Sequence, residues 1–288
     1  MSTIMELLEG VKVEWKALGE VAKVSSGGTP RTGVEEYYGG DIPWLRTQEV
    51  DFGEIWDTGV KITEAGLKNS SAKWIPEDSV IVAMYGATVG KIGINKIPMA
   101  TNQACANIHL DENIANYRYV FYYLSSQYEY IKSLGTGPQT NINAQIVKNL
   151  QIPIPPLAIQ AEIVYILDAF TAHTAELTAE LTARKKQYNY YRDQLLSFDD
   201  GEVQWKLLGE LAENLDSMRK PITSGLRDSG EIPYYGASGV VDYVKGYIFD
   251  GDFLLVSEDG ANLIARSTPI AFSINRPISF RGHGIIEP

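Results

Sequence analysis

The sequence predicts a mixed α/β protein in which one module occurs twice, on either side of a long helix. The first observation is an internal repeat, because residues 13–22 (VEWKALGEVA) return as residues 203–212 (VQWKLLGELA). The second is a heptad pattern of apolar residues from Ile163 onward. The third is a pair of short apolar runs around a glycine-rich turn. We therefore expect four segments, namely an N-terminal segment 1–12, a complete module 13–155, a helix 156–198 and an incomplete second module 199–288.

Two further matches support the repeat. Ile42-Pro43-Trp44 returns as Ile232-Pro233-Tyr234 at the same offset, and Asp78–Val82 returns as Asp252–Val256 at a shorter one. The second copy shows no match to residues from about 108 to 155 of the first. We therefore expect residues from about 203 onward to lack much of their sheet.

Within the first module, Ser79–Met84 and Lys91–Ile94 are the apolar runs, and we expect both to form buried strands. The stretch Asn116–Ile131 is rich in aromatic residues with helical spacing. This pattern favours core packing over a cofactor site.

The connector is expected to be one long helix that begins at Pro155-Pro156 and ends at Asp199-Asp200-Gly201. Some 40 residues of helix span roughly 60 Å, which is too long to bury within either module. We expect the helix to pair with another helix; the alternative is that it lies across its own module. Thr174 and Arg184 interrupt the pairing positions, which are Ile163, Leu167, Phe170, Leu177, Leu181, Tyr188, Tyr191 and Leu195.

Composition limits the class of protein. The chain has no run of 18 apolar residues and no basic start before an apolar segment, so we expect a cytoplasmic protein rather than a membrane or secreted one. The single cysteine, Cys105, lies in an apolar setting and is expected to be a core thiol. The formal net charge is −11, but residues 13–150 hold 12 basic and 15 acidic residues. Weak DNA binding by the chain alone, strengthened by a basic face or partner, is compatible with this balance.

Common catalytic patterns do not fit. The run Gly86–Lys91 is one residue short of a phosphate-binding loop, and Ile92 stands where a magnesium ligand is needed. Glu14-Trp15-Lys16 has the form of a nuclease motif without its acidic partner, and Glu14 becomes Gln204 in the repeat. The histidines are scattered, at positions 109, 173 and 283. We expect a binding protein with no catalytic residue and no metal site; an enzyme with an unrecognised site is the less favoured alternative.

Polar, glycine-rich loops of the first module are the candidate DNA contacts. Small residues and backbone amides suit close approach to phosphates, and arginine and glutamine side chains can make paired hydrogen bonds to guanine and adenine. Each loop taken alone is more often an ordinary turn, and only their joint density favours binding. The candidates are Ser25, Gly27, Gly28, Thr29, Arg31, Arg46, Thr47, Gln48, Tyr85, Thr88, Lys91, Asn102, Gln103, Thr136, Gln139, Asn141 and Asn143.

These motifs together resemble a known family. Gly27–Pro30, Ile42–Arg46, Gly86–Lys91, Gln139–Asn143 and Ile152–Leu157 are similar to a target recognition domain of type I restriction-modification specificity subunits. Residues 158–164 and 184–196 resemble the central helix of that family, in its IC branch.

The resemblance implies two recognition domains held apart by two antiparallel helices, with each domain reading one half of a split double-stranded DNA target. It implies a non-catalytic subunit whose spacer helix binds modification subunits, in a complex that also holds restriction subunits. S-adenosylmethionine, ATP and Mg²⁺ would then belong to the partner subunits, and this chain would hold no cofactor.

The sequence departs from the family pattern in two ways. The second module is incomplete, and a second long helix is missing from the sequence. We expect a C-terminally truncated form. Two copies could pair their single helices and read a palindromic, interrupted target. The alternative is a coiled-coil scaffold or remnant that recognises no DNA sequence.

Overall fold

The computed structural model describes residues 8–135, 141–199, 201, 203–236, 239–256, 271–275, 277–280 and 284–287. The chain divides into two compact units, Met1–Tyr188 and Asn189–Pro288. The division falls inside the long helix, which was predicted to be a segment of its own. Among the described residues, no helix is long and apolar enough to cross a membrane.

The centre of unit 1 is a five-stranded sheet in the order β2-β9-β6-β7-β4. Neighbouring strands are antiparallel except β4, which runs parallel to β7. Every residue of β6 and β7 is buried, which confirms the two predicted strands. The bounds are β2 (Ala22–Ser26), β4 (Glu54–Ile55), β6 (Val80–Ala83), β7 (Ile92–Asn95) and β9 (Cys105–Leu110).

Two smaller sheets complete unit 1. Strand β3 (Tyr38–Leu45) pairs antiparallel with β5 (Lys61–Ile62) and parallel with β8 (Ala100–Thr101). Strand β1 (Glu14–Ala17) pairs antiparallel with β10 (Gln151–Ile154), so the start and the end of the module lie side by side.

Helices cover the central sheet and close the core. Tyr119, Val120, Phe121 and Leu124 of α4 are buried against the apolar strands, which confirms that the aromatic stretch packs in the core. This stretch forms two helices rather than one, with a break at Gln127. The remaining elements are α2 (Leu18–Val21), α3 (Glu64–Lys68), α4 (Tyr117–Ser126), α5 (Tyr128–Ser133), α6 (Ala144–Lys148), and the 3₁₀ turns η1 (Glu35–Tyr37), η2 (Thr47–Glu49) and η3 (Gly86–Thr88).

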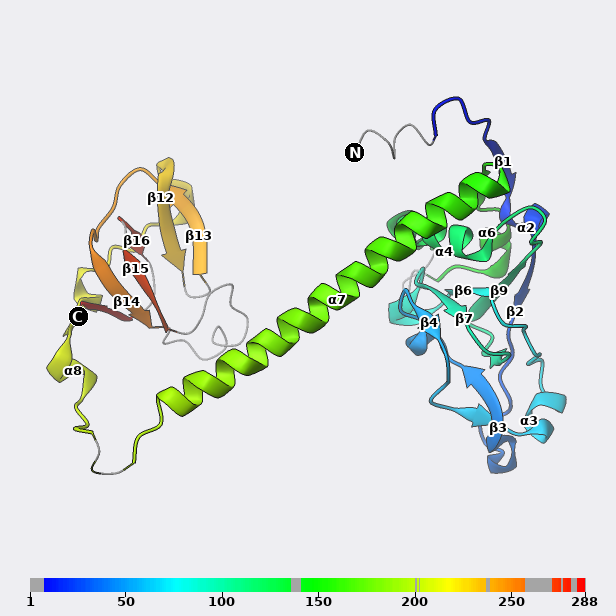
Figure 1. Ribbon diagram of the computed structural model, residues 1–288, viewed down its shortest axis with the longest axis horizontal. Helices are drawn as coiled ribbons and strands as arrows, with labels where there is room; N and C mark the ends of the chain where they lie inside the picture. The colour runs from blue at the N-terminus through cyan, green and yellow to red at the C-terminus, as the bar shows by residue number, and fades with distance from the viewer. Residues whose placement is uncertain are drawn as a thin grey trace. The chain divides into compact units, whose positions relative to one another are not determined.

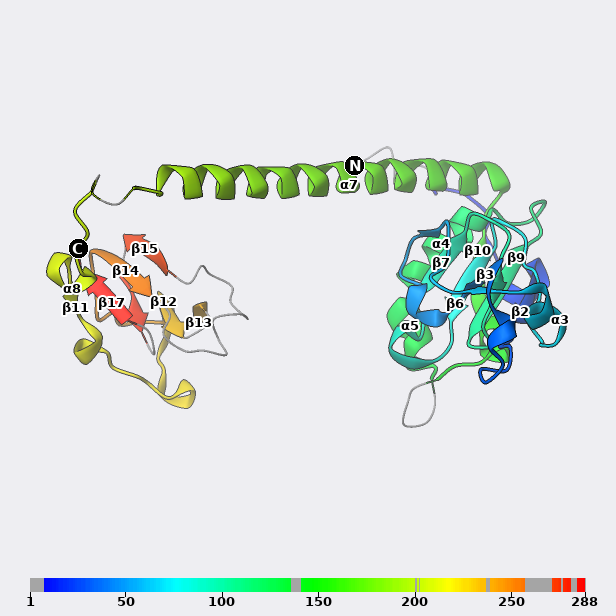
Figure 2. The ribbon, with the colours of Figure 1, turned by 90° about the horizontal axis from the view of Figure 1, so that it is seen from below.

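The connector forms one uninterrupted helix, α7 (Leu157–Leu195). Both ribbon views place its first turns beside α4 (Figures 1 and 2). Gln160 and Val164 are buried there, whereas every residue of α7 from Ala169 onward is exposed.

Unit 2 repeats the strand pattern of unit 1. The order β11-β17-β14-β15 corresponds to β2-β9-β6-β7, and β13-β12-β16 corresponds to β5-β3-β8, with the same parallel and antiparallel pairs. The bounds are α8 (Leu208–Leu211), β11 (Glu213–Asn214), η4 (Asp216–Met218), η5 (Ser224–Leu226), β12 (Ser229–Gly236), β13 (Gly239–Val244), β14 (Asp252–Val256), β15 (Ala271–Asn275), β16 (Ser279–Phe280) and β17 (Gly284–Glu287).

The expectation that the second copy lacks much of its sheet is therefore wrong. Its strands find their partners among residues 213–287, so both sheets form. Over the parts of unit 2 that the structure describes, what has no counterpart is β1, β4, β10 and the helices α3 to α6.

Candidate nucleic-acid interface

Loops from distant parts of unit 1 meet at one end of the central sheet. The Gly28 amide donates to the Thr101 carbonyl at 2.8 Å, and the Asn102 amide donates to the Leu45 carbonyl at 2.9 Å. Trp44 joins the same group of loops, because its indole Nε1 donates to the Gly28 carbonyl at 2.9 Å.

Two more loops join this end of the sheet. The Met84 amide donates to the Ala104 carbonyl at 2.8 Å, and the Ile142 amide donates to the Met84 carbonyl at 3.0 Å. The turns η2 and η3 also lie in contact. We call residues 25–31, 45–48, 84–91, 101–104 and 141–143 the loop rim. The structure thus brings together the described candidate DNA contacts, although they are spread over more than 100 residues of sequence.

The candidates differ in what they expose. Thr136 and Gln139 lie outside the described residues, and Gly28 and Thr47 are buried. Half-buried are Gly27, Thr29, Arg46, Thr88, Lys91, Asn102 and Asn141. Exposed are Ser25, Arg31, Gln48, Tyr85, Gln103 and Asn143.

The roles expected of Gly27 and Gly28 need correction. A Cβ atom on Gly27 would lie 2.2 Å from the Thr101 carbonyl oxygen, and one on Gly28 would lie 2.1 Å from the Ala72 amide nitrogen. Both amides donate within the module, to the carbonyls of Cys105 and Thr101. These glycines therefore allow the loops to pack against each other, and their amides are not available to a phosphate. Thr47 is also buried, so its side chain is not available for a DNA contact.

Ion pairs hold two basic side chains of the rim, Arg46 and Lys91, in place. Arg46 Nε lies 3.6 Å from Glu49 Oε2, and the same carboxylate accepts hydrogen bonds from the amides of Arg46 and Gly59. Lys91 Nζ lies 2.6 Å from Asp51 Oδ1. These pairs reduce the rotamer freedom that binding would otherwise have to remove.

The asparagines of the rim also have structural contacts. The side-chain oxygens of Asn102, Asn141 and Asn143 accept hydrogen bonds from the amides of Ala104, Gly86 and Ile146 respectively. Asn143 thereby caps α6. Each contact orients the side chain through its oxygen, and the amide nitrogen is the group directed to other partners.

Sequence reasoning missed a small aromatic and basic group beside Lys91. The Phe52 ring packs edge-on against Tyr128 at 5.1 Å between centroids, and Lys132 Nζ lies 5.4 Å from the Tyr128 centroid. Phe52 has a φ of 54°, in the left-handed region that non-glycine residues rarely adopt. Strained residues of this kind occur often at functional sites. The i, i+4 spacing of Tyr128 and Lys132 was the signal available in the sequence.

The described residues contain no group of three or more His, Cys, Asp or Glu side chains that could hold a metal ion. Cys105 is buried, and burial raises the pKa of its thiol to about 12. The thiol therefore stays protonated near neutral pH, as expected of a core residue.

Helix α7 carries an apolar stripe that matches part of the predicted pairing positions. Side chains 52 to 73% exposed form what we call the heptad stripe: Phe170, Leu177, Leu181, Tyr188 and Leu195. Tyr191 is also exposed. Ile163 and Leu167 are only half-exposed, and Ile163 packs against the core of unit 1. The pairing face therefore begins later than predicted, because the first turns of α7 cover their own module.

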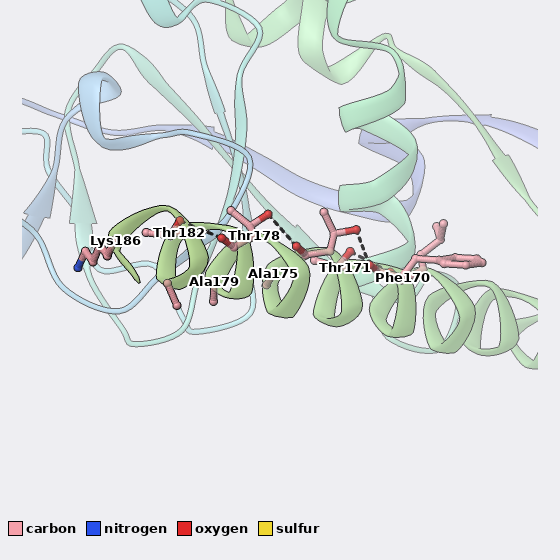
Figure 3. Close-up of a pocket in the computed structure, with 10 residues that line it drawn as sticks. Phe170, Thr171, Ala175, Thr178, Ala179, Thr182 and Lys186 are labelled. Carbon is pink, nitrogen blue, oxygen red and sulfur yellow. Dashed lines mark hydrogen bonds between the residues drawn. The ribbon is translucent and has the colours of Figure 1, made fainter. Parts of the chain in front are cut away.

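A second face of α7 holds small residues along a shallow groove (Figure 3). The hydroxyls of Thr171, Thr174, Thr178 and Thr182 each donate to the carbonyl four residues earlier, at 2.8 to 2.9 Å. Because these hydroxyls are bound to the helix itself, the threonines contribute methyl groups to the groove. We call this face the threonine stripe.

Comparisons with known proteins agree with the architecture. Residues 11–185 match the family model described as the type I restriction modification DNA specificity domain. The chain is 37% identical over 284 residues to the type I restriction enzyme EcoprrI specificity subunit of Escherichia coli, which covers 91% of this chain and 70% of that protein. It is 36% identical to the EcoR124I/EcoR124II specificity subunit of Escherichia coli, over 74% of this chain and 52% of that protein.

Solved structures support the fold. A type I restriction-modification S subunit from M. genitalium matches with a TM-score of 0.60 at 18% identity, covering 96% of this chain and 72% of that one. A chain from a structural study of complex assembly in the type I R-M system matches with a TM-score of 0.55, also at 18% identity, over 96% of this chain and 75% of that one. The family match covers more than half of the chain, and a relative above 30% identity is aligned over nearly all of it. This chain therefore belongs to the family of type I restriction-modification DNA specificity subunits, whose members are non-catalytic.

Proposed function

We propose that this chain reads one half of a split DNA target through the loop rim of unit 1. The observation that carries the proposal is the convergence of separate loops at one end of the central sheet, held by backbone hydrogen bonds. Arg31, Gln48 and Gln103 are exposed on these loops. Such side chains can form paired hydrogen bonds to base edges in the major groove.

Helix α7 is the proposed attachment site for other subunits. An exposed apolar stripe on a helix of 39 residues is stabilised by burial against a second helix. We propose that modification subunits and a partner helix bind along α7, and that restriction subunits join the resulting complex. The partner helix would be supplied by a second copy of the chain.

The proposed partners also account for the charge. With a formal net charge of −11, the chain alone is poorly suited to bind a polyanion. Partner subunits would supply additional phosphate contacts, and S-adenosylmethionine, ATP and Mg²⁺ would be bound by them. Recognition of cellular DNA would place the complex in the cytoplasm.

DNA selection tests the reading function. The chain is assembled with its cognate modification subunits, and bound fragments are recovered from random double-stranded DNA and sequenced. We expect one split motif. Gln48→Ala should relax the preference at one base pair by about 1–3 kcal/mol without changing the rest of the motif. The control is Gln151→Ala, which removes an exposed glutamine from β10. An assembled complex that selects no sequence would overturn the proposal and favour a scaffold role.

The mass of the chain in solution tests helix pairing. We expect a dimer, or a complex holding two copies, that dissociates when Leu181→Glu places a charge in the heptad stripe. Glu180→Gln, one residue away and outside the stripe, should leave the mass unchanged. A monomer with and without modification subunits would contradict pairing between copies.

A further inference from the structure

The joint between α7 and the recognition module contains buried polar contacts. Gln160, in the first turn of α7, has no exposed surface. Its Oε1 accepts a hydrogen bond from the Asn116 amide at 2.8 Å, and its Nε2 donates to the carbonyls of Ile114 and Pro155 at 3.1 and 2.8 Å. Every bonding group of this amide except one oxygen lone pair is thus used, which fixes the start of the helix against the module.

A second anchor lies two turns further along α7. Arg118 of α4 donates to Asp168 Oδ1 from Nη2 at 2.7 Å and from Nε at 3.1 Å. Its Nη1 donates to Glu54 Oε1 at 2.5 Å, so the guanidinium joins α7, α4 and β4. The Tyr122 hydroxyl donates to the same Asp168 oxygen at 2.5 Å and lies 3.3 Å from Thr171 Oγ1. Paired charge-assisted bonds of this kind restrain direction as well as distance.

Between Ala172 and Gln187, no hydrogen bond or ion pair joins α7 to the other described residues of its own module, and the contacts of this stretch lie within the helix. All residues of α7 from Ala172 onward are exposed. Gln160 alone is a pivot close to the helix start, whereas two anchors eight residues apart define an axis. Ile163 and Val164 add apolar packing between the two anchors, and the Arg118–Asp168 contact is the charged restraint at the point where the exposed part of α7 begins.

We propose that Arg118 is a positioning residue that sets the number of base pairs between the two recognised half-sites. This inference rests on the proposed function, because it concerns the distance from one reading surface to the partner at the far end of α7. The 27 residues from Asp168 to Leu195 extend for about 40 Å. A swing of about 5° at the joint displaces the far end by about 3.5 Å, which is close to one base-pair step of about 3.4 Å.

The spacing of selected DNA sites tests the proposal. Arg118→Gln with Asp168→Asn removes the ion pair without leaving a charged, unpaired Asp168; Glu54, the second carboxylate bonded to Arg118, is exposed and stays solvated. In complexes with modification subunits, the wild-type chain should select one spacing, and the double variant should select the same half-sites at two or three spacings. Arg184→Gln with Glu180→Gln neutralises a comparable pair, 3.5 Å apart on the exposed part of α7, and should keep the single spacing. Unchanged spacing in the Arg118 variant would overturn the inference.

A distance measurement keeps the test independent of DNA binding. Spin labels are placed at Lys68→Cys on α3 and Lys185→Cys on α7, in full-length chain diluted with unlabelled chain; Cys105 is fully buried and stays unlabelled. The distribution of label distances should be narrow in the wild type and broader in the Arg118 variant, and an equally narrow distribution would overturn the inference. If the wild type selects no split sequence, the proposed function fails, whereas the label distances still decide whether Arg118 directs the helix.

Discussion

Units 1 and 2 share their strand order but differ in how the surface beneath the first helix is covered. In unit 1, Leu18 and Val21 of α2 are 0 and 1% exposed, whereas their counterparts in α8, Leu208 and Leu211, are 51 and 57% exposed. In unit 1 this surface is covered by α6 and β10, and the Leu18 amide donates to the Leu150 carbonyl at 2.8 Å. The strands of each sheet are therefore sufficient to form that sheet. Covering the apolar side chains of the first helix also requires α6 and β10, which lie in the segment that leads into α7.

The largest expected difference between the units concerns these leucines. Leu18→Ala should destabilise unit 1 by about 2–5 kcal/mol, because it leaves a cavity in a closed core. Leu208→Ala should change the stability of unit 2 by no more than about 0.5 kcal/mol, because the side chain is exposed. Hydrogen exchange followed by mass spectrometry reports the two units separately. Equal losses of protection would show that α8 is covered in solution and that the contrast between the units is wrong.

Glycines at matching positions should instead show that the units behave alike. A Cβ atom on Gly40 of β3 would lie 2.5 Å from the Ile62 carbonyl oxygen, and one on Gly230 of β12 would lie 2.4 Å from the Val244 carbonyl carbon. Either glycine-to-alanine change should cost about 1–3 kcal/mol in its own unit. Gly33→Ala, with no atom within 4 Å of the added Cβ, is the control. A cost confined to one unit, read by the same exchange measurement, would break the structural equivalence of β3 and β12.

A smaller effect is expected for the aromatic residues at the repeated Ile-Pro-aromatic motif. Trp44 donates from Nε1 to the Gly28 carbonyl at 2.9 Å, and the Tyr234 hydroxyl accepts from the Ile222 amide at 2.8 Å. Each bond ties an upstream loop to the strand. Tyr234→Phe should cost about 0.5–1.5 kcal/mol, as expected for one lost hydrogen bond, and should speed exchange of the Ile222 amide. Unaltered exchange at Ile222 would show that this loop is held by other contacts.

The smallest expected effect is acid sensitivity of one ion pair in each unit. Burial raises the pKa of Asp168, but hydrogen bonds from Arg118 and Tyr122 outweigh it and hold the pKa below the usual 3.8. Hydrogen bonds from Arg227 and the Tyr243 amide lower the pKa of Asp242. A lowered folded-state pKa adds stability above the unfolded-state pKa, and this stability is lost as pH falls through the folded-state pKa. The Tm difference between wild type and the Asp168→Asn or Asp242→Asn variant should therefore be present near neutral pH and shrink below about pH 3.8. A difference that persists in acid would show that packing rather than charge holds these contacts.

Local patterns in the sequence were sufficient for much of the fold. The apolar runs predicted β6 and β7, the aromatic spacing predicted helices at α4 and α5, and the repeat predicted that one module occurs twice, which agrees with the strand order that the two units share. The extent of unit 2 was underestimated, because β17 at residues 284–287 matches β9 in its pairing and not in its sequence.

The candidate site was predictable only in outline. Glycine-rich turns were located correctly, but the use of Gly28 as a packing contact depends on Thr101 and Ala72, which are far away in the sequence. The left-handed conformation of Phe52 and its contact with Tyr128 likewise arise from tertiary structure. Such long-range contacts leave no periodic signal in a single sequence.

The two stripes on α7 wind around the helix in opposite senses. Successive residues of an α-helix are turned by about 100°, so a repeat of seven falls about 20° short of two full turns and a repeat of four overshoots one turn by about 40°. The heptad stripe therefore stays on nearly the same side of α7 from Phe170 to Leu195, whereas the threonine stripe moves steadily away from it between Thr174 and Thr182. A partner helix that winds gently around α7 in a left-handed supercoil can follow the heptad stripe over its whole length. The same partner can touch the threonine stripe only where it crosses α7, so close approach to the small residues is limited to one or two turns.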